Sequence, residues 1–200
     1  DSLDQVLLLL SDVVVMGQIT LKFFQVEHSI MDSMGTIIET PVGSAIHPGD
    51  WTMEREPDGS THIRYDQLRH AKRPSILMLE SLGSLKGGRH ATYKEMYDTL
   101  HEILNKAPGR VIVTTFGSQV ERVRWLIEAS KDLGKKVAID GYSMKKNIEM
   151  ARELGYVKPA KGTMIDIHQT DDYPDKKVVI VCTGAQGEEN AALSRIVNRQ

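Results

Sequence analysis

The sequence predicts an α/β protein in two parts: a set of antiparallel strands, followed by a mostly parallel sheet flanked by helices. Up to residue 48, short β-rich runs are separated by turn signals such as Met16-Gly17 and Pro41-Val42-Gly43, a pattern typical of an antiparallel sheet. From residue 75 onward, short apolar runs alternate with longer helical patterns, which indicates a parallel sheet with helical crossovers. We therefore place a domain boundary between residues 74 and 75.

Four strands are expected in the first part, because β-branched and aromatic residues concentrate in four short runs. These runs cover residues 13–15, 19–26, 36–40 and 44–47. Residues 51–74 are polar and include the turn Pro57-Asp58-Gly59, so we interpret them as a connector.

The second part is expected to contain four strands, each followed by a helix. Thr92-Tyr93-Lys94-Glu95 forms a capping box, and Gly134 and Gly155 stand where helix C-caps belong. The expected strands are residues 76–79, 111–113, 137–139 and 178–182, and the expected helices are residues 93–106, 119–133, 144–154 and 188–198.

Composition points to a soluble, cytoplasmic protein without a membrane span. The net charge is −2 and 40% of the residues are hydrophobic, so any contact with nucleic acid must be local rather than a property of the whole surface. The longest uninterrupted apolar run, residues 6–10, is too short to cross a bilayer. The single cysteine, Cys182, lies in an apolar run and is expected to be a small buried residue rather than part of a disulfide.

Two residues have side chains that suit a metal site, and each closes a β-rich run: His28 and Asp50. A neutral imidazole and a carboxylate are common zinc ligands, and a carboxylate can bridge two zinc ions. A lone histidine after a strand is more often a structural polar residue, so the metal interpretation depends on sequence context.

That context is a resemblance to the metallo-β-lactamase superfamily, and within it to the β-CASP ribonucleases of the ribonuclease J type. The family's His-Ser-Ile-Pro-Asp-Ser and Thr-Gly-Asp boxes each supply one metal ligand. This chain has His28-Ser29-Ile30-Met31-Asp32-Ser33 and Pro48-Gly49-Asp50, which differ from the boxes at one non-ligand position each. Farther on, residues 178–188 and 191–195 are similar to the family's strand, its Thr-Gly-Ser-Gln-Gly-Glu turn and its Ala-Leu-Ser-Arg helix.

The resemblance implies the edge of a metallo-β-lactamase β-sheet domain over residues 1–74 and a β-CASP domain over residues 75–200. It implies two zinc ions in the intact enzyme, with His28 and Asp50 among their ligands. It also implies single-stranded RNA as the partner, 5′-to-3′ exonuclease and endonuclease activity, and a homo-oligomeric intact enzyme. The family's main ligand cluster contains His-x-His, which does not occur in these 200 residues. We interpret the chain as an internal segment that neither holds the ions nor cleaves RNA by itself.

Glu80 is a candidate catalytic residue, because it ends the expected strand 76–79 and open α/β sheets bind ligands at the carboxyl ends of their strands. Family members carry an acidic residue at the end of their first such strand. A carboxylate there can orient a catalytic water, although it can equally cap the turn that follows.

Two strand-to-helix turns are candidate phosphate sites, since helix N-termini offer free N–H groups and a favourable dipole. An aromatic residue in the first turn can stack on a base. The alternative is that glycine, serine and threonine merely form the bends. The candidate residues are Thr115, Phe116, Ser118 and Arg122 at the first turn, and Thr183, Gly184 and Gln186 at the second.

Two other functions stay open. The same fold could serve as a non-catalytic module for RNA binding or assembly. It could also belong to a metallo-β-lactamase-fold hydrolase that acts on DNA or on a small ester.

Overall fold

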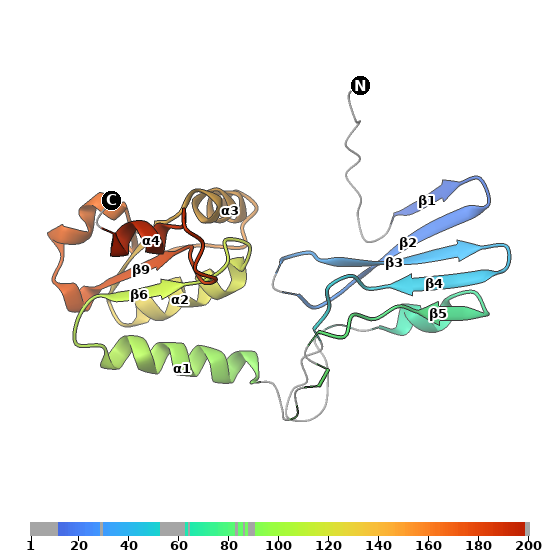
Figure 1. Ribbon diagram of the computed structural model, residues 1–200, viewed down its shortest axis with the longest axis horizontal. Coiled ribbons are helices and arrows are strands. Elements are labelled where there is room, and N and C mark those ends of the chain that lie inside the picture. The colour runs from blue at the N-terminus through green and yellow to red at the C-terminus, as the bar shows by residue number, and fades with distance from the viewer. Residues whose placement is uncertain are drawn as a thin grey trace, which may run out of the picture. The chain divides into compact units, whose positions relative to one another are not determined.

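The computed structural model describes residues 12–28, 30–52, 63, 65–82, 84, 85, 87 and 91–198. By its contacts the chain divides into two units, residues 1–92 and 93–200, and Figure 1 shows the elements of each. The predicted connector residues 53–62, Ser29 of the first box and Gly83 after Glu80 lie outside the described residues.

The first unit holds a five-stranded sheet in the order β1-β2-β3-β4-β5. Its first four strands are antiparallel hairpin neighbours, as the sequence predicts. Because β3 lies between β2 and β4 and is antiparallel to both, β2 and β4 run in the same direction. The strands are β1 (Val13–Met16), β2 (Ile19–Gln25), β3 (Met34–Thr40), β4 (Gly43–His47) and β5 (Ser75–Leu77).

Strand β5 differs from the prediction, which assigned it to the second, parallel sheet. It pairs in parallel with β4, with Ala45 opposite Ile76, and the Ser44 N–H donates to the Pro74 carbonyl at 2.9 Å. Gly43 permits this approach, because a Cβ at that position would lie 2.3 Å from the Pro74 oxygen. An apolar run of this length fits either sheet, so the sequence pattern does not decide between them. Pairing with β4, which is distant in the sequence, places this strand in the first sheet.

One face of the first sheet is covered by the connector. A short 3₁₀ helix, η1 (Asp66–His70), follows the segment outside the described residues. Leu68 of η1, together with Trp51 and Tyr65, packs against a core made of Phe24, Val26, Ile37, Ile46 and Ala71. Part of the predicted connector therefore packs on the first sheet and contributes to its core.

The second unit contains a four-stranded sheet in the order β6-β9-β7-β8, and all its pairings are parallel. This confirms the predicted parallel sheet flanked by helices. The elements are α1 (Tyr93–Lys106), β6 (Val111–Thr114), α2 (Val120–Asp132), β7 (Lys136–Asp140), α3 (Tyr142–Glu153), β8 (Met164–Ile165), β9 (Val178–Cys182) and α4 (Ala192–Val197).

Strand β9 is the centre of this unit, since every residue from Val178 to Cys182 is buried. Helices α2 and α3 pack against β7 and against each other. Ala192 of α4 packs with Ile180 and Cys182 of β9, so both faces of the sheet are covered, as expected for parallel strands. Burial raises the pKa of the Cys182 thiol to about 11, which supports its prediction as a buried structural residue. Among the described residues, no helix is long and apolar enough to cross a membrane.

Candidate metal and nucleic-acid sites

His28 and Asp50 are brought together by a bridge just beyond the end of β2. Glu27 pairs with Thr52 in an isolated antiparallel bridge, in which the Thr52 N–H donates to the Glu27 carbonyl at 2.9 Å. The His28 Nε2 lies 3.8 Å from the Asp50 Oδ2. The two side chains therefore converge, as the ligands of one metal ion would.

The geometry of this pair fits two ligands of one zinc ion. Tetrahedral zinc with bonds of about 2.0–2.2 Å separates its ligand atoms by about 3.4 Å, close to the observed 3.8 Å. The His28 side chain is 23% exposed and that of Asp50 is 83% exposed, so the pair is open to an ion on the Asp50 side. Within the described residues, no group of three or more candidate ligand side chains occurs. His28 and Asp50 would supply two of the four ligands that a zinc ion needs.

The turn before Asp50 is held by a hydrogen bond from its backbone to a neighbouring side chain. Gly49 adopts a φ of 73°, and its N–H donates to the His47 Nδ1 at 3.1 Å. In the other box, the Ser33 hydroxyl donates to the Ile30 carbonyl at 2.7 Å. His47 and Ser33 therefore shape the two turns that present the ligand pair.

Glu80 follows β5 at the same end of the first sheet as His28 and Asp50. Strands β2, β4 and β5 run in one direction, and the three residues come within four positions after these strands end. The Glu80 Oε2 accepts the Leu82 N–H at 2.8 Å, so the carboxylate caps the turn that follows. A role in catalysis stays a proposal.

In the second unit, the two predicted turns lie side by side at the carboxyl edge of the sheet. Strands β6 and β9 are neighbours, with Thr114 opposite Cys182, and the Thr115 N–H donates to the Cys182 carbonyl at 3.1 Å. The third turn, which begins at Gly141 after β7, joins them at this edge, because the Asn147 Nδ2 of α3 donates to the Gly117 carbonyl at 2.8 Å.

The candidate side chains of the first turn differ in their exposure. Thr115 is only 2% exposed, and its hydroxyl donates to the Gln119 Oε1, so this side chain stabilises the turn. Phe116 is 41% exposed, and Ser118 and Arg122 are exposed as well. The surface available to a ligand is therefore formed by Phe116, Ser118 and Arg122.

The second turn makes internal hydrogen bonds that the sequence does not predict. Helix α4 begins at Ala192 rather than near residue 188, and its Ala192 N–H donates to the Thr183 Oγ1 at 3.3 Å. Gly184 has a φ of 126°, and a Cβ there would lie 2.7 Å from the Leu193 Cβ. The Gln186 N–H donates to the Glu188 Oε2 at 3.2 Å. These internal bonds occupy donors that the prediction assigned to phosphate.

An ion cluster that sequence reasoning missed lies at the same carboxyl edge. Asp140, the last residue of β7, meets the Lys145 Nζ at 3.1 Å and an Arg195 guanidinium nitrogen at 3.4 Å. Burial by itself raises the pKa of the Asp140 carboxyl, but hydrogen bonds from Lys145 and from the Gly141 N–H, together with the positive charges of Lys145 and Arg195, outweigh burial and hold that pKa below its ordinary value. No sequence motif joins residues this far apart.

This cluster makes the stability of the second unit depend on pH. A folded-state pKa below the unfolded value contributes stability above the unfolded pKa, and the contribution is lost as the pH falls through the folded pKa. Asp140→Asn is therefore expected to lower the free energy of unfolding at pH 7 by about 1 kcal/mol, and the difference from wild type should shrink toward pH 3. Urea unfolding across this range measures it. Asp172→Asn, at an exposed carboxylate, is the control, and a difference that stays constant with pH would contradict the role of the Asp140 charge.

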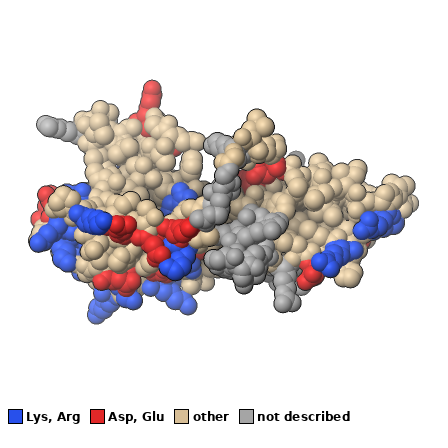
Figure 2. Space-filling model, turned by 90° about the horizontal axis from the view of Figure 1, so that it is seen from below, with Lys and Arg blue, Asp and Glu red and all other residues tan. Residues whose placement is uncertain are grey.

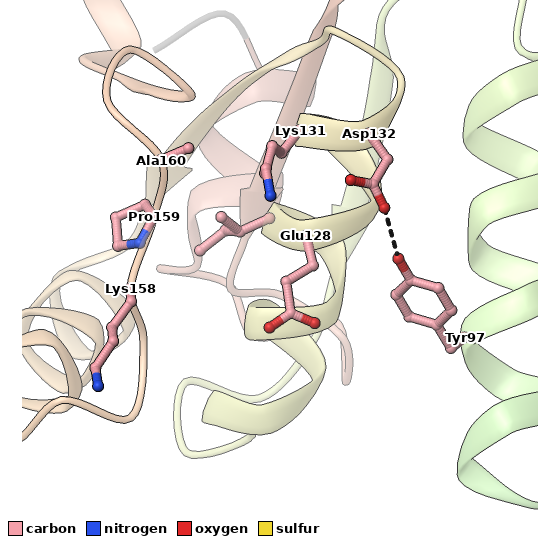
Figure 3. Close-up of a pocket in the computed structure, with 8 residues that line it drawn as sticks. Tyr97, Glu128, Lys131, Asp132, Lys158, Pro159 and Ala160 are labelled. Atoms are coloured by element: carbon pink, nitrogen blue, oxygen red, sulfur yellow. Dashed lines mark hydrogen bonds between the residues drawn. The ribbon is translucent and has the colours of Figure 1, made fainter.

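A separate cavity of about 380 Å³ lies between α1, α2 and the segment after α3 (Figure 3). The Tyr97 hydroxyl donates to the Asp132 Oδ2 at 3.3 Å, and burial together with the Asp132 charge raises the pKa of Tyr97. Because α2 starts at the carboxyl edge and ends before β7, its last residues lie near the amino edge of the sheet. The cavity therefore contains none of the predicted site residues.

Charge on the molecule is mixed. On the face seen in Figure 2, basic and acidic side chains lie interspersed. Several of the basic residues form ion pairs, among them Lys94 with Asp98 and Arg110 with Asp171. The charge distribution therefore gives no broad basic face on the side seen in Figure 2, so any attraction of nucleic acid would depend on local groups.

Comparisons with known proteins agree with this arrangement. Residues 108–200 match the family model for the ribonuclease J β-CASP domain. The chain is 35% identical to a Ribonuclease J of Thermus thermophilus over 88% of this chain and 31% of that protein. It is 36% identical to a Ribonuclease J of Corynebacterium glutamicum over 92% of this chain and 26% of that protein.

The chain thus spans between about a quarter and a third of these relatives. A crystallised Enterococcus faecalis protein of unknown function shares the fold with a TM-score of 0.65 and 16% identity, over 93% of this chain and 46% of that one. The chain therefore belongs to the ribonuclease J family, and residues 108–200 match its β-CASP domain.

Proposed function

We propose that the chain is part of a zinc-dependent ribonuclease that hydrolyses RNA phosphodiester bonds, as a 5′-to-3′ exonuclease and endonuclease. The observation that carries this proposal is the 3.8 Å approach of the His28 Nε2 to the Asp50 Oδ2, in a chain whose relatives are ribonucleases J. The family resemblance also supports a cytoplasmic enzyme that is a homo-oligomer when intact.

His28 and Asp50 would hold zinc through Nε2 and Oδ2, with the remaining ligands supplied by other parts of the intact enzyme. Bound zinc supplies a hydroxide nucleophile at neutral pH and stabilises negative charge on the phosphate oxygens. Glu80 lies at the same edge of the first sheet as the ligand pair. We propose that its second carboxylate oxygen, Oε1, orients the attacking water while Oε2 holds the Leu82 N–H.

The carboxyl edge of the second sheet would hold the RNA. Phe116 offers an exposed ring for stacking on a base, and Ser118 and Arg122 offer a hydroxyl and a positive charge at the start of α2. The backbone around Thr183, Gly184 and Gln186 forms the neighbouring wall of this edge. A phosphodiester strand would run across both turns.

The double substitution Ser118→Ala with Arg122→Ala is expected to weaken binding of a single-stranded RNA oligomer by about fivefold at low salt. Losing one phosphate contact should also lower the slope of log affinity against log salt by about 0.7. Fluorescence anisotropy with labelled RNA measures both values. Arg152→Ala is the matched control, because Arg152 is an exposed arginine in the last turn of α3. Affinity unchanged by the double substitution would remove this turn from the RNA path.

The decisive experiment compares substrates in the intact enzyme. End-labelled single-stranded RNA, DNA of the same sequence and a chromogenic ester are each incubated with the zinc-loaded protein. Zinc-dependent cleavage of RNA alone supports the proposal. Binding of RNA without cleavage would favour a non-catalytic module, and cleavage of DNA or of the ester would favour a different hydrolase of the same fold.

A further inference from the structure

The third turn of the carboxyl edge, from Gly141 to Met144, carries an exposed aromatic residue beside two cations. Tyr142 is the first residue of α3 and is 84% exposed. Lys145 follows one turn later on the same helix. Arg195, from α4, pairs with the same carboxylate as Lys145, that of Asp140. An exposed ring next to positive charge is the combination that single-stranded nucleic acid contacts, with a base on the ring and a phosphate on the cations.

The two cations carry more charge than their partner neutralises. Lys145 and Arg195 share one carboxylate, Asp140, so the cluster keeps a net charge of about +1. The Lys145 side chain is 49% exposed and that of Arg195 is 44% exposed, whereas that of Asp140 is 19% exposed. Asp140 therefore pairs with both cations. Arg195 also donates from Nη1 to the Asn190 carbonyl at 3.3 Å, and both side chains stay partly exposed to solvent.

The turn is continuous with the two turns that we assign to RNA. A Cβ on Gly141 would lie 2.6 Å from the Thr183 Oγ1, and a Cβ on Gly117 would lie 2.8 Å from the Ser143 Oγ. The backbone of the third turn thus touches both of the other turns. A strand of RNA that follows the edge from Phe116 would meet Tyr142 and its neighbouring cations.

We propose that Tyr142, Lys145 and Arg195 form a further contact for single-stranded RNA, with Tyr142 stacked on a base and Lys145 and Arg195 bound to a phosphate. This inference rests on the proposed function, because it extends the RNA path of the same edge. Asp140 acts as a positioning residue that fixes the two cations.

The test measures binding of a labelled single-stranded oligouridylate to the 200-residue chain by fluorescence anisotropy at low salt. Tyr142→Ala is expected to weaken binding by about tenfold, within the range for loss of one stacked base, and Tyr142→Phe should restore it because the ring remains. Lys145→Gln with Arg195→Gln should weaken binding by about tenfold and lower the salt slope by about 0.7 per lost phosphate contact. Lys161→Gln is the control, since Lys161 is an exposed lysine in the loop before β8, at the opposite edge of the sheet.

Thermal unfolding of each variant separates loss of contact from loss of fold, and Tyr142→Ala removes a side chain that is 84% exposed. One outcome separates this inference from the proposed function. Wild type binds RNA and Ser118→Ala with Arg122→Ala weakens the binding, but neither Tyr142→Ala nor Lys145→Gln with Arg195→Gln does. In that case this inference fails and the proposed function stands. If wild type binds no RNA, both fail. Equal loss in Tyr142→Phe and Tyr142→Ala would overturn the stacking role.

Discussion

Replacing His28 or Asp50 with Ala in the intact protein is expected to lower the proposed RNA hydrolysis by at least about 100-fold. The reason is chemical: each side chain is proposed to donate directly to zinc, and loss of groups that only orient a ligand already costs about 10- to 100-fold. The two side chains meet at 3.8 Å, so either substitution removes half of this pair. Single-turnover cleavage of end-labelled RNA, with zinc content measured on the same samples, gives the effect on chemistry and on metal together.

Matched controls exist in the second unit. His168→Ala and Asp172→Ala remove the same side-chain types from exposed positions outside the proposed site, and both variants are expected to keep wild-type cleavage and zinc content. RNA affinity in the absence of zinc should also be unchanged in the His28 and Asp50 variants, because the turns that we propose to bind RNA lie in the other unit. Full zinc content and full activity after loss of His28 would show that this residue is structural.

Gly141→Ala is expected to lower the free energy of unfolding of the second unit by about 3 kcal/mol. Gly141 has a φ of 105°, which costs an alanine about 1–3 kcal/mol. Its new Cβ would also lie 2.6 Å from the Thr183 Oγ1 and 2.9 Å from the Thr183 Cγ2, and relief of such a contact costs about 1–3 kcal/mol more. Chemical denaturation followed by tryptophan fluorescence in a Trp51→Phe background reports this unit, because Trp125, buried in α2, is then the remaining tryptophan of the sequence.

Gly134→Ala separates the cost of the positive φ from the cost of the close Cβ contact. Gly134 also has a positive φ, 61°, but its nearest neighbour would be the flexible Lys177 Nζ at 3.5 Å. This variant is expected to lose only about 1 kcal/mol. If Gly141→Ala cost no more than Gly134→Ala, the close packing of the Gly141 and Thr183 turns would not stabilise the unit.

Local patterns predicted most of the fold. The four antiparallel strands and the alternation of strands and helices after residue 92 follow from hydrophobic period and turn residues, which act within a few positions of the chain. Helix α1 begins at Tyr93 and ends at Lys106, as the capping box and periodicity indicate. The pair of His28 and Asp50 was found through two family boxes, since neither residue is distinctive alone.

Contacts between distant residues decided the rest. Strand β5 joined β4 because the Pro74 carbonyl accepts the Ser44 N–H, and α4 starts late because Thr183 accepts its first N–H. The cluster of Asp140, Lys145 and Arg195 depends on the order of the strands in the sheet. The sequence by itself determined which segments form strands and helices and which family the chain resembles, because periodicity and motifs are local. Only the tertiary structure decided which strand ends meet at one edge, because pairing and packing energies depend on partners that are far apart in the chain.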